Sequence, residues 1–328
     1  MTMYLSYTGR KTYLTCPRKY HYSYILKDRT RVGDARGSFL GSIIGRVFEW
    51  FYTRRAWATS NPLETTVSYV EDATREVFLR ERFDKSSDPA FYGILCRDLE
   101  KYVPTGIEII RNNGLLSSQS RAETDLTIEY TSQKHEMTLK IGGRSDFLHG
   151  NSEKDIWLLD GKASKHRDKY VDSEQLIWYA NQHFLKYHIA PTRLGFIFWC
   201  FPEDPIKWIA YNNNNMRSSL DKTFEVAKKI QLNQFDSIPS PECKRCDYRE
   251  KCEDGIKYLV KHKAEAGERI DFDNSIFSFI TSVDSHILPT IFQLTVTTQQ
   301  YGELLRVSWG RFNQQVRCHS NPNWGLYI

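Results

Sequence analysis

The chain has 328 residues and a formal net charge of +5, and this length allows one sizeable core with additions. Hydrophobic residues make up 40% and charged residues 26%, close to the averages of folded proteins, so a disordered chain is excluded. The small excess of basic residues permits a polyanionic partner without requiring one. The longest strongly apolar run, Leu194 to Phe201, falls far short of the roughly 20 residues of a membrane helix, and the N-terminus has no apolar signal core.

The first third of the sequence predicts helices. Residues 4–24 are basic and aromatic, and Pro17 suits the first turn of a helix. Residues 39–57 have apolar side chains at helical spacing, and residues 64–112 continue this periodicity with a turn near 85–89. We expect helices separated by short loops.

The middle of the sequence predicts alternating strands and helices. Three strands of a compact β-meander are expected, at residues 126–130, 137–141 and 156–160. A helix over residues 174–187, a buried strand near 195–201 and an amphipathic helix over 216–231 follow. The expected fold is α/β, with a mixed central sheet flanked by helices.

Two carboxylates and a lysine are predicted to meet at one point. Asp160 and Lys162 lie two apart on a strand and therefore share a face, and a hairpin-length connection can bring Asp146 beside them. Carboxylates hold Mg²⁺, and a neighbouring lysine can orient or deprotonate a water, which is the chemistry of phosphodiester cleavage. Glu123 is a candidate supporting carboxylate. A surface salt bridge is the alternative, but the apolar residues 156–159 favour a buried site.

Further polar groups can serve such a site. Gln175 and Tyr179 are four apart and lie on one helical face, where they could contact a phosphate or the metal's water. Basic residues interleaved with tyrosines are typical of a single-strand path, although a solvated helix face explains the N-terminal ones equally well. The candidate nucleic-acid contacts are Arg10, Lys11, Arg18, Lys19, Lys165 and Arg167.

Three cysteines form a compact group. Cys243, Cys246 and Cys252 have the spacing C-x₂-C-x₅-C, which indicates metal binding in a reducing compartment, such as the cytoplasm of a bacterial or phage-infected cell. A fourth ligand is needed, and Cys16 is the best candidate. Zinc and an iron–sulfur cluster both suit four thiolates.

The series GGRSD, D-G-K after an apolar run, and Q-x-x-x-Y resembles the RecB-like branch of the PD-(D/E)XK nucleases, over roughly residues 4–255. The resemblance implies a restriction-endonuclease-like core, Asp146 and Asp160 as ligands of Mg²⁺ or Mn²⁺, Lys162 as the catalytic lysine, and Gln175 and Tyr179 on an active-site helix. One feature departs from the pattern. The branch usually has a histidine ligand at the end of G-x-x-x-H, where this chain has Gly45.

The cysteine pattern is similar to that of RecB-like nucleases of the CRISPR-adaptation and exonuclease-V types. This likeness implies a [4Fe–4S] cluster held by Cys16, Cys243, Cys246 and Cys252, with structural Zn²⁺ as the alternative. It also implies a nuclease domain over residues 1–262, with cluster ligands at both ends. The remaining residues, 263–328, would form a β-rich extension of unknown function.

These features together predict a metal-dependent DNA exonuclease. It would act on single-stranded DNA or DNA ends in recombination, repair, replication or the processing of foreign DNA. The sequence has no G-x-x-x-x-G-K-[ST] phosphate loop, so unwinding would need a helicase or recombination partner. The alternative is a non-catalytic nucleic-acid-binding or assembly subunit that retains the nuclease fold.

Overall fold

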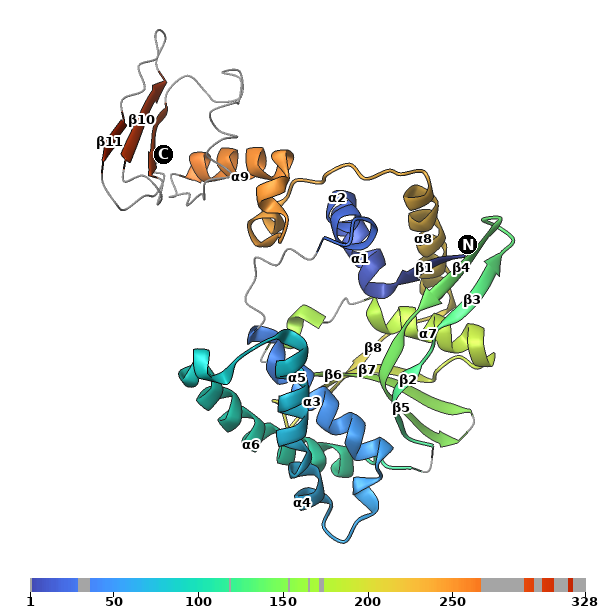
Figure 1. Ribbon diagram of the computed structural model, residues 1–328. Helices are drawn as coiled ribbons and strands as arrows, with labels where there is room; N and C mark the ends of the chain where they lie inside the picture. Colours follow the sequence, from blue (N-terminus) through green and yellow to red (C-terminus); the bar gives the residue numbers. More distant parts are fainter. Residues whose placement is uncertain are drawn as a thin grey trace. The chain divides into compact units, whose positions relative to one another are not determined.

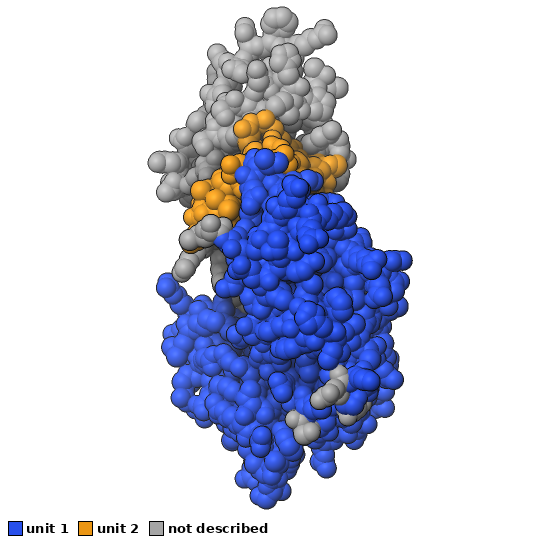
Figure 2. Space-filling model, turned by 90° about the vertical axis from the view of Figure 1, so that its right-hand side faces the viewer, with its two compact units in different colours: residues 1–10, 34–232 blue, residues 11–33, 233–328 orange. Residues whose placement is uncertain are grey.

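The computed structural model describes residues 2–28, 36–117, 119–152, 154–164, 166–170, 174–266, 292–297, 303–309 and 318–320. The chain divides into two compact units. Unit 1 comprises residues 1–10 and 34–232, and unit 2 comprises residues 11–33 and 233–328; Figure 2 colours them separately.

A five-stranded mixed sheet is the centre of unit 1 (Figure 1). Its strands, in spatial order, are β2 (Arg121–Asp125), β5 (Arg144–Ser152), β6 (Asp155–Lys162), β7 (Arg193–Phe198) and β8 (Ile206–Ile209). β5 and β6 form an antiparallel hairpin, whereas β6 and β7 run parallel and are joined through α7 (Gln175–Tyr187). The structure confirms the expected mixed α/β architecture.

A second sheet corrects the expectation of one β-meander. β3 (Ile128–Ser132) and β4 (Met137–Gly142) pair with each other, but β4 continues to β1 (Met3–Ser6) in a parallel pair instead of joining β5. The chain passes from one sheet to the other at Gly142 and Gly143, and a Cβ at Gly143 would overlap the side chain of Gln182. Glycine at this position lets the chain pass Gln182 without displacing its side-chain amide. Residues 4–6, expected in a helix, belong instead to β1, because they pair with β4.

Helices lie early in unit 1, as the sequence predicted, although the predicted helical stretch before residue 85 is divided into two helices at Ser68. The early helices are α3 (Arg36–Thr53), α4 (Pro62–Val67), α5 (Tyr69–Glu81) and α6 (Pro89–Asn112). The predicted turn near 85–89 separates α5 from α6, because Asp88 caps α6 by accepting from the backbone N–H of Phe91 at 3.0 Å and Pro89 occupies its first turn.

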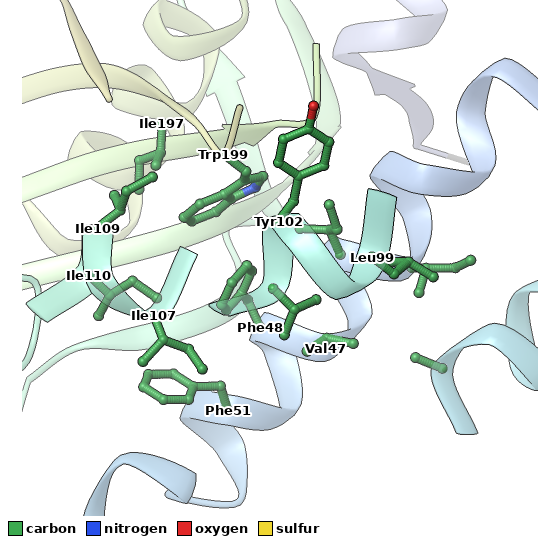
Figure 3. Close-up of a cluster of buried hydrophobic side chains, with 14 of the residues drawn as sticks. Val47, Phe48, Phe51, Leu99, Tyr102, Ile107, Ile109, Ile110, Ile197 and Trp199 are labelled. Atoms are coloured by element: carbon green, nitrogen blue, oxygen red, sulfur yellow. The ribbon is translucent and has the colours of Figure 1, made fainter. Parts of the chain in front are cut away.

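The hydrophobic core joins these helices to the sheet (Figure 3). Phe48 of α3 packs against Trp199, just beyond β7, with ring centroids 4.5 Å apart. Ile107 and Ile110 of α6 are buried in the same cluster. Each such side chain contributes about 1.5–3 kcal/mol on burial, so this cluster fixes α3 and α6 against one face of the sheet.

The helices α7 and α8 (Asn213–Gln231) lie later in unit 1. α7 packs against β6 and β7 and against α8. Asn212 starts α8 with a capping box that includes Asn215. The predicted helices at 174–187 and 216–231 are both present, and α7 brings its first turn next to the end of β6.

Unit 2 contains the cysteine-rich segment. α1 (Tyr7–Thr15) begins in unit 1 and ends in unit 2, and α2 (Pro17–Tyr20) follows it. The later elements are short 3₁₀ turns at 241–245 and 249–251, α9 (Glu253–Ala266) and an antiparallel sheet of β9 (Phe292–Thr297), β10 (Glu303–Trp309) and β11 (Cys318–Ser320). The predicted boundary at residue 262 stays a prediction. In the described part of the chain, no helix combines the length and apolarity needed to cross a membrane.

Candidate active site

Three carboxylates lie in a row across neighbouring strands. The β5–β6 register pairs Phe147 with Leu159, which sets Asp146 opposite Asp160. In β2, the register around Glu123 sets that residue opposite Asp146 on the other side. Glu123 has a φ of 49°, which is uncommon for a residue other than glycine and marks local strain. The hairpin predicted from sequence thus brings Asp146 and Asp160 together.

Burial raises the pKa of two of these carboxylates, Asp146 and Asp160. Asp160 is 1% exposed. Burial and the nearby charge of Asp160 raise the pKa of Asp146 well above its usual value, although the ammonium of Lys162 opposes this. Burial also raises the pKa of Asp160, again against Lys162. Two carboxylates forced together in this way favour either a shared proton or a bound cation.

Lys162 is held beside them. Its ammonium forms an ion pair with Asp160, and its side chain is 18% exposed. Burial alone would lower the pKa of Lys162, but the charge of Asp160 raises it overall. The lysine is therefore a cation in the metal-free protein, and it can offset negative charge on a phosphate.

Gln175 connects this group to α7. Its Nε2 donates to Asp160 Oδ1 at 2.9 Å and lies 3.0 Å from the hydroxyl of Tyr179. Its Oε1 accepts from Lys162 Nζ at 3.5 Å. Burial raises the pKa of Tyr179, so this hydroxyl stays protonated at neutral pH. Four of the five residues predicted from the motifs therefore form one connected network, and the fifth, Asp146, lies opposite Asp160 on β5.

A cavity of about 330 Å³ opens beside Asp146. Gly45 and Glu49 of α3 line it together with Glu123. A Cβ built at Gly45 meets nothing within 4 Å, so the space that the resemblance assigns to a histidine is open. Burial and the charge of Glu49 raise the pKa of Glu123. Glu49 lies one helical turn after Gly45. It was not among the residues predicted from the sequence, although its i,i+4 spacing from Gly45 indicated that both would lie on the same face of the helix.

The donor set fits a hard divalent cation. Mg²⁺ commonly uses one or two protein carboxylates and completes its shell with water, and the buried pair of Asp146 and Asp160 provides such ligands. Among the described residues, no group of three or more His, Cys, Asp or Glu side chains is arranged to hold a metal ion.

The four predicted cluster cysteines all line one cavity of unit 2, of about 80 Å³. Gly255 lies beside two of them, since a Cβ there would be 3.5 Å from Cys252 Sγ and 3.6 Å from Cys243 Sγ, at ordinary contact distance. Burial raises the pKa of Cys246, and the charges of Cys243 and Cys16 add to this. Thiolates of this kind bind zinc or an iron–sulfur cluster, but among the described residues these four side chains are not arranged as a metal site, so the four-cysteine cluster stays a prediction.

The prediction that Arg10 contacts nucleic acid is wrong. Its side chain is 1% exposed, because its guanidinium bonds to Glu174 and Ser219 inside unit 1. A phosphate cannot reach it.

The other basic candidates lie in varied surroundings. Lys11 is exposed, and Lys19 lines the cysteine cavity. Arg18 pairs with Asp254 at 3.3 Å. Arg167 pairs with Asp204 at 2.7 Å, and Lys165 lies outside the described residues. Their roles stay predictions.

Comparison with known proteins supplies the family. Residues 4–253 match the family model described as the PD-(D/E)XK nuclease superfamily. The comparison with curated proteins finds no match. Among solved structures, one titled "Crystal structure of SSO0001" is similar with 15% sequence identity and a TM-score of 0.28, covering 75% of this chain and 94% of that chain. Since the family model spans most of the sequence, the chain belongs to the PD-(D/E)XK nuclease superfamily.

Proposed function

We propose that this protein is a metal-dependent DNA exonuclease of the RecB-like branch, which hydrolyses phosphodiester bonds in single-stranded DNA or at DNA ends. Membership of the superfamily implies a nuclease and a nucleic-acid substrate. The observation that carries the proposal is the connected network of Asp160, Lys162, Gln175 and Tyr179, with Asp146 directly across the β5–β6 pair.

Each residue has a distinct part in the reaction. Asp146 and Asp160 would hold Mg²⁺ or Mn²⁺, which supplies a Lewis acid at the scissile phosphate. Lys162 offsets the negative charge that develops on the phosphate and orients the attacking water. Gln175 keeps the Asp160 carboxylate in place through its bond to Oδ1. Glu123 supports the site from β2.

The test compares cleavage of end-labelled linear single-stranded DNA with that of circular single-stranded DNA, in Mn²⁺ or Mg²⁺. The wild type should release short products from the linear substrate and leave the circle intact. Lys162→Ala should lower the rate by a factor of about 10² or more. Lys154→Ala is the matched control, because Lys154 is an exposed lysine at the same hairpin. Equal activity of wild type and Lys162→Ala would refute the assignment, and cleavage of the circle would make the enzyme an endonuclease.

We further propose that Cys16, Cys243, Cys246 and Cys252 bind a [4Fe–4S] cluster. Their convergence on one cavity supports a thiolate site, and the sequence resemblance favours iron over zinc. Protein purified without oxygen should be brown and contain iron and sulfide. Cys246→Ala should lose the colour, whereas Cys200→Ala should keep it. A colourless preparation with stoichiometric zinc would replace the cluster by a zinc site.

A non-catalytic nucleic-acid-binding or assembly subunit is the second candidate. Gly45 favours it, because the histidine that the resemblance expects is missing beside Asp146. This protein would bind single-stranded DNA without cutting it in any divalent metal. Binding that is tight, salt-dependent and unaccompanied by cleavage would establish it over the nuclease.

A further inference from the structure

A buried arginine near the N-terminus, Arg10 of α1, contacts α7 and α8. Arg10 Nη1 donates to the backbone oxygen of Ser219 at 2.8 Å and to the hydroxyls of Ser219 and Thr223 at 3.1 and 3.3 Å. Its Nη2 donates to Glu174 Oε2 at 2.7 Å, and its guanidinium lies 4.9 Å from the ring centroid of Trp178. One side chain of α1 therefore contacts both α7 and α8.

Stability alone is a weak reason for this arrangement. Burying a guanidinium is costly, and replacing a buried ion pair by apolar side chains of similar volume is often neutral or stabilising. Arg10 is distinguished by the residue that it contacts. Its ion pair with Glu174 fixes the start of α7, and α7 carries Gln175 and Tyr179 of the proposed active site.

Glu174 stands at the start of α7. It is the N-cap residue, and its side chain makes no capping bond. Its carboxylate is held instead by Arg10 at 2.7 Å and by Lys222 Nζ at 3.2 Å, while its backbone oxygen accepts from Trp178 at 2.9 Å. The ion pairs to α1 and α8 therefore locate the first turn of α7.

The next residue in the chain is Gln175, which bonds to Asp160 at 2.9 Å. A shift of the first turn of α7 would pull this amide from the carboxylate. Displacements of about 1 Å can lower catalytic rates by a factor of about 10².

We propose that Arg10 is a positioning residue, which sets α7 through Glu174 so that Gln175 holds Asp160 in the reactive geometry. This inference rests on the proposed nuclease function. It replaces the sequence-based assignment of Arg10 to nucleic-acid binding.

The variants separate positioning from folding. Arg10→Met removes the guanidinium but keeps a long apolar side chain, and Glu174 retains Lys222 as a partner. Arg10→Lys keeps the charge without the forked set of donors. Arg54→Met is the control for loss of an arginine over a tryptophan ring, because the exposed Arg54, just past the end of α3, lies 4.1 Å from the centroid of Trp50.

The first readout needs no activity. Hydrogen exchange of the amides at residues 178–182, which follow the first turn of α7, should become at least tenfold faster in Arg10→Met and stay unchanged in Arg54→Met. Unchanged exchange in Arg10→Met would overturn the proposal. If the wild type cleaves no DNA, the proposed function fails, and this measurement still decides whether Arg10 positions α7.

The second readout links position to catalysis. Arg10→Met should lower kcat at least tenfold with little change in KM, and Arg10→Lys should recover part of the loss. In a Gln175→Ala background, Arg10→Met should cost much less, because the residue through which it acts is already gone. Equal losses in the two backgrounds, or a loss of kcat matched by a loss of folded protein, would show a structural role alone and overturn the proposal.

Discussion

Replacing Gly45 by histidine should tighten the binding of transition-metal ions. The position faces the cavity of about 330 Å³ that Asp146 also lines, and a Cβ there meets nothing within 4 Å, so an imidazole can enter without displacing its neighbours. One added ligand worth about 1.4 kcal/mol corresponds to a tenfold lower Kd. Because imidazole suits Mn²⁺ and Ni²⁺ better than Mg²⁺, we expect about tenfold for Mn²⁺, more for Ni²⁺ and little for Mg²⁺.

The assay is titration calorimetry on the metal-free protein, with Gly45→Ala as the control. Glycine inside a helix costs about 1 kcal/mol relative to alanine, so both variants should stabilise α3, and the alanine variant isolates that effect. Asp146→Asn should abolish the gain in Mn²⁺ affinity. The reasoning is refuted if Gly45→His and Gly45→Ala bind Mn²⁺ equally well, because the cavity would then not direct a side chain at residue 45 toward the carboxylates.

Three other outcomes are expected. Asp146→Asn should raise the free energy of unfolding of the metal-free protein at pH 7 by roughly 1–3 kcal/mol, because it removes a buried charge. Urea titrations with a chelator measure this free energy, and a lower stability of the variant would contradict the prediction. Because the pKa of Asp146 is raised in the folded protein, folding favours the protonated carboxyl group. The free energy of unfolding should therefore fall as the pH rises from the ordinary pKa of aspartate toward the raised pKa, and Asp146→Asn should reduce this pH dependence in the same titrations. Gly106→Ala should cost about 1–3 kcal/mol, because its Cβ overlaps the ring of Phe48, whereas Gly93→Ala in the same helix meets Arg97 at an ordinary 3.7 Å and should be neutral or stabilising by thermal unfolding.

The sequence was sufficient where the deciding contacts are local. Asp160 and Lys162 share a face because alternation along a strand is fixed by the backbone, and Asp146 joins them through a short hairpin. Gln175 and Tyr179 are neighbours because they are one turn apart. These relations need no knowledge of the rest of the fold.

Contacts between segments far apart in the sequence could not be predicted in this way. Periodicity could not show that residues 3–6 would pair with β4, so a helix was expected where a strand formed. The basic and aromatic pattern around Arg10 fits a nucleic-acid path as well as a core position, and its partner Glu174 lies 164 residues away. Whether such a charged residue lies in the core or on a binding surface therefore depends on which distant segment packs against it.

Stability and metal binding at this site have one physical origin. Glu123, Asp146 and Asp160 bring negative charge into a partly buried row, and Lys162 pairs with Asp160. Burial and the nearby charge of Asp160 raise the pKa of Asp146, and we expect them to lower the stability of the metal-free fold at neutral pH, whereas a divalent cation would relieve both effects. Stabilisation by Mn²⁺ should therefore be smaller in Asp146→Asn than in the wild type at the same Mn²⁺ concentration, whereas the metal-free variant should be the more stable of the two, so that the two measurements check each other.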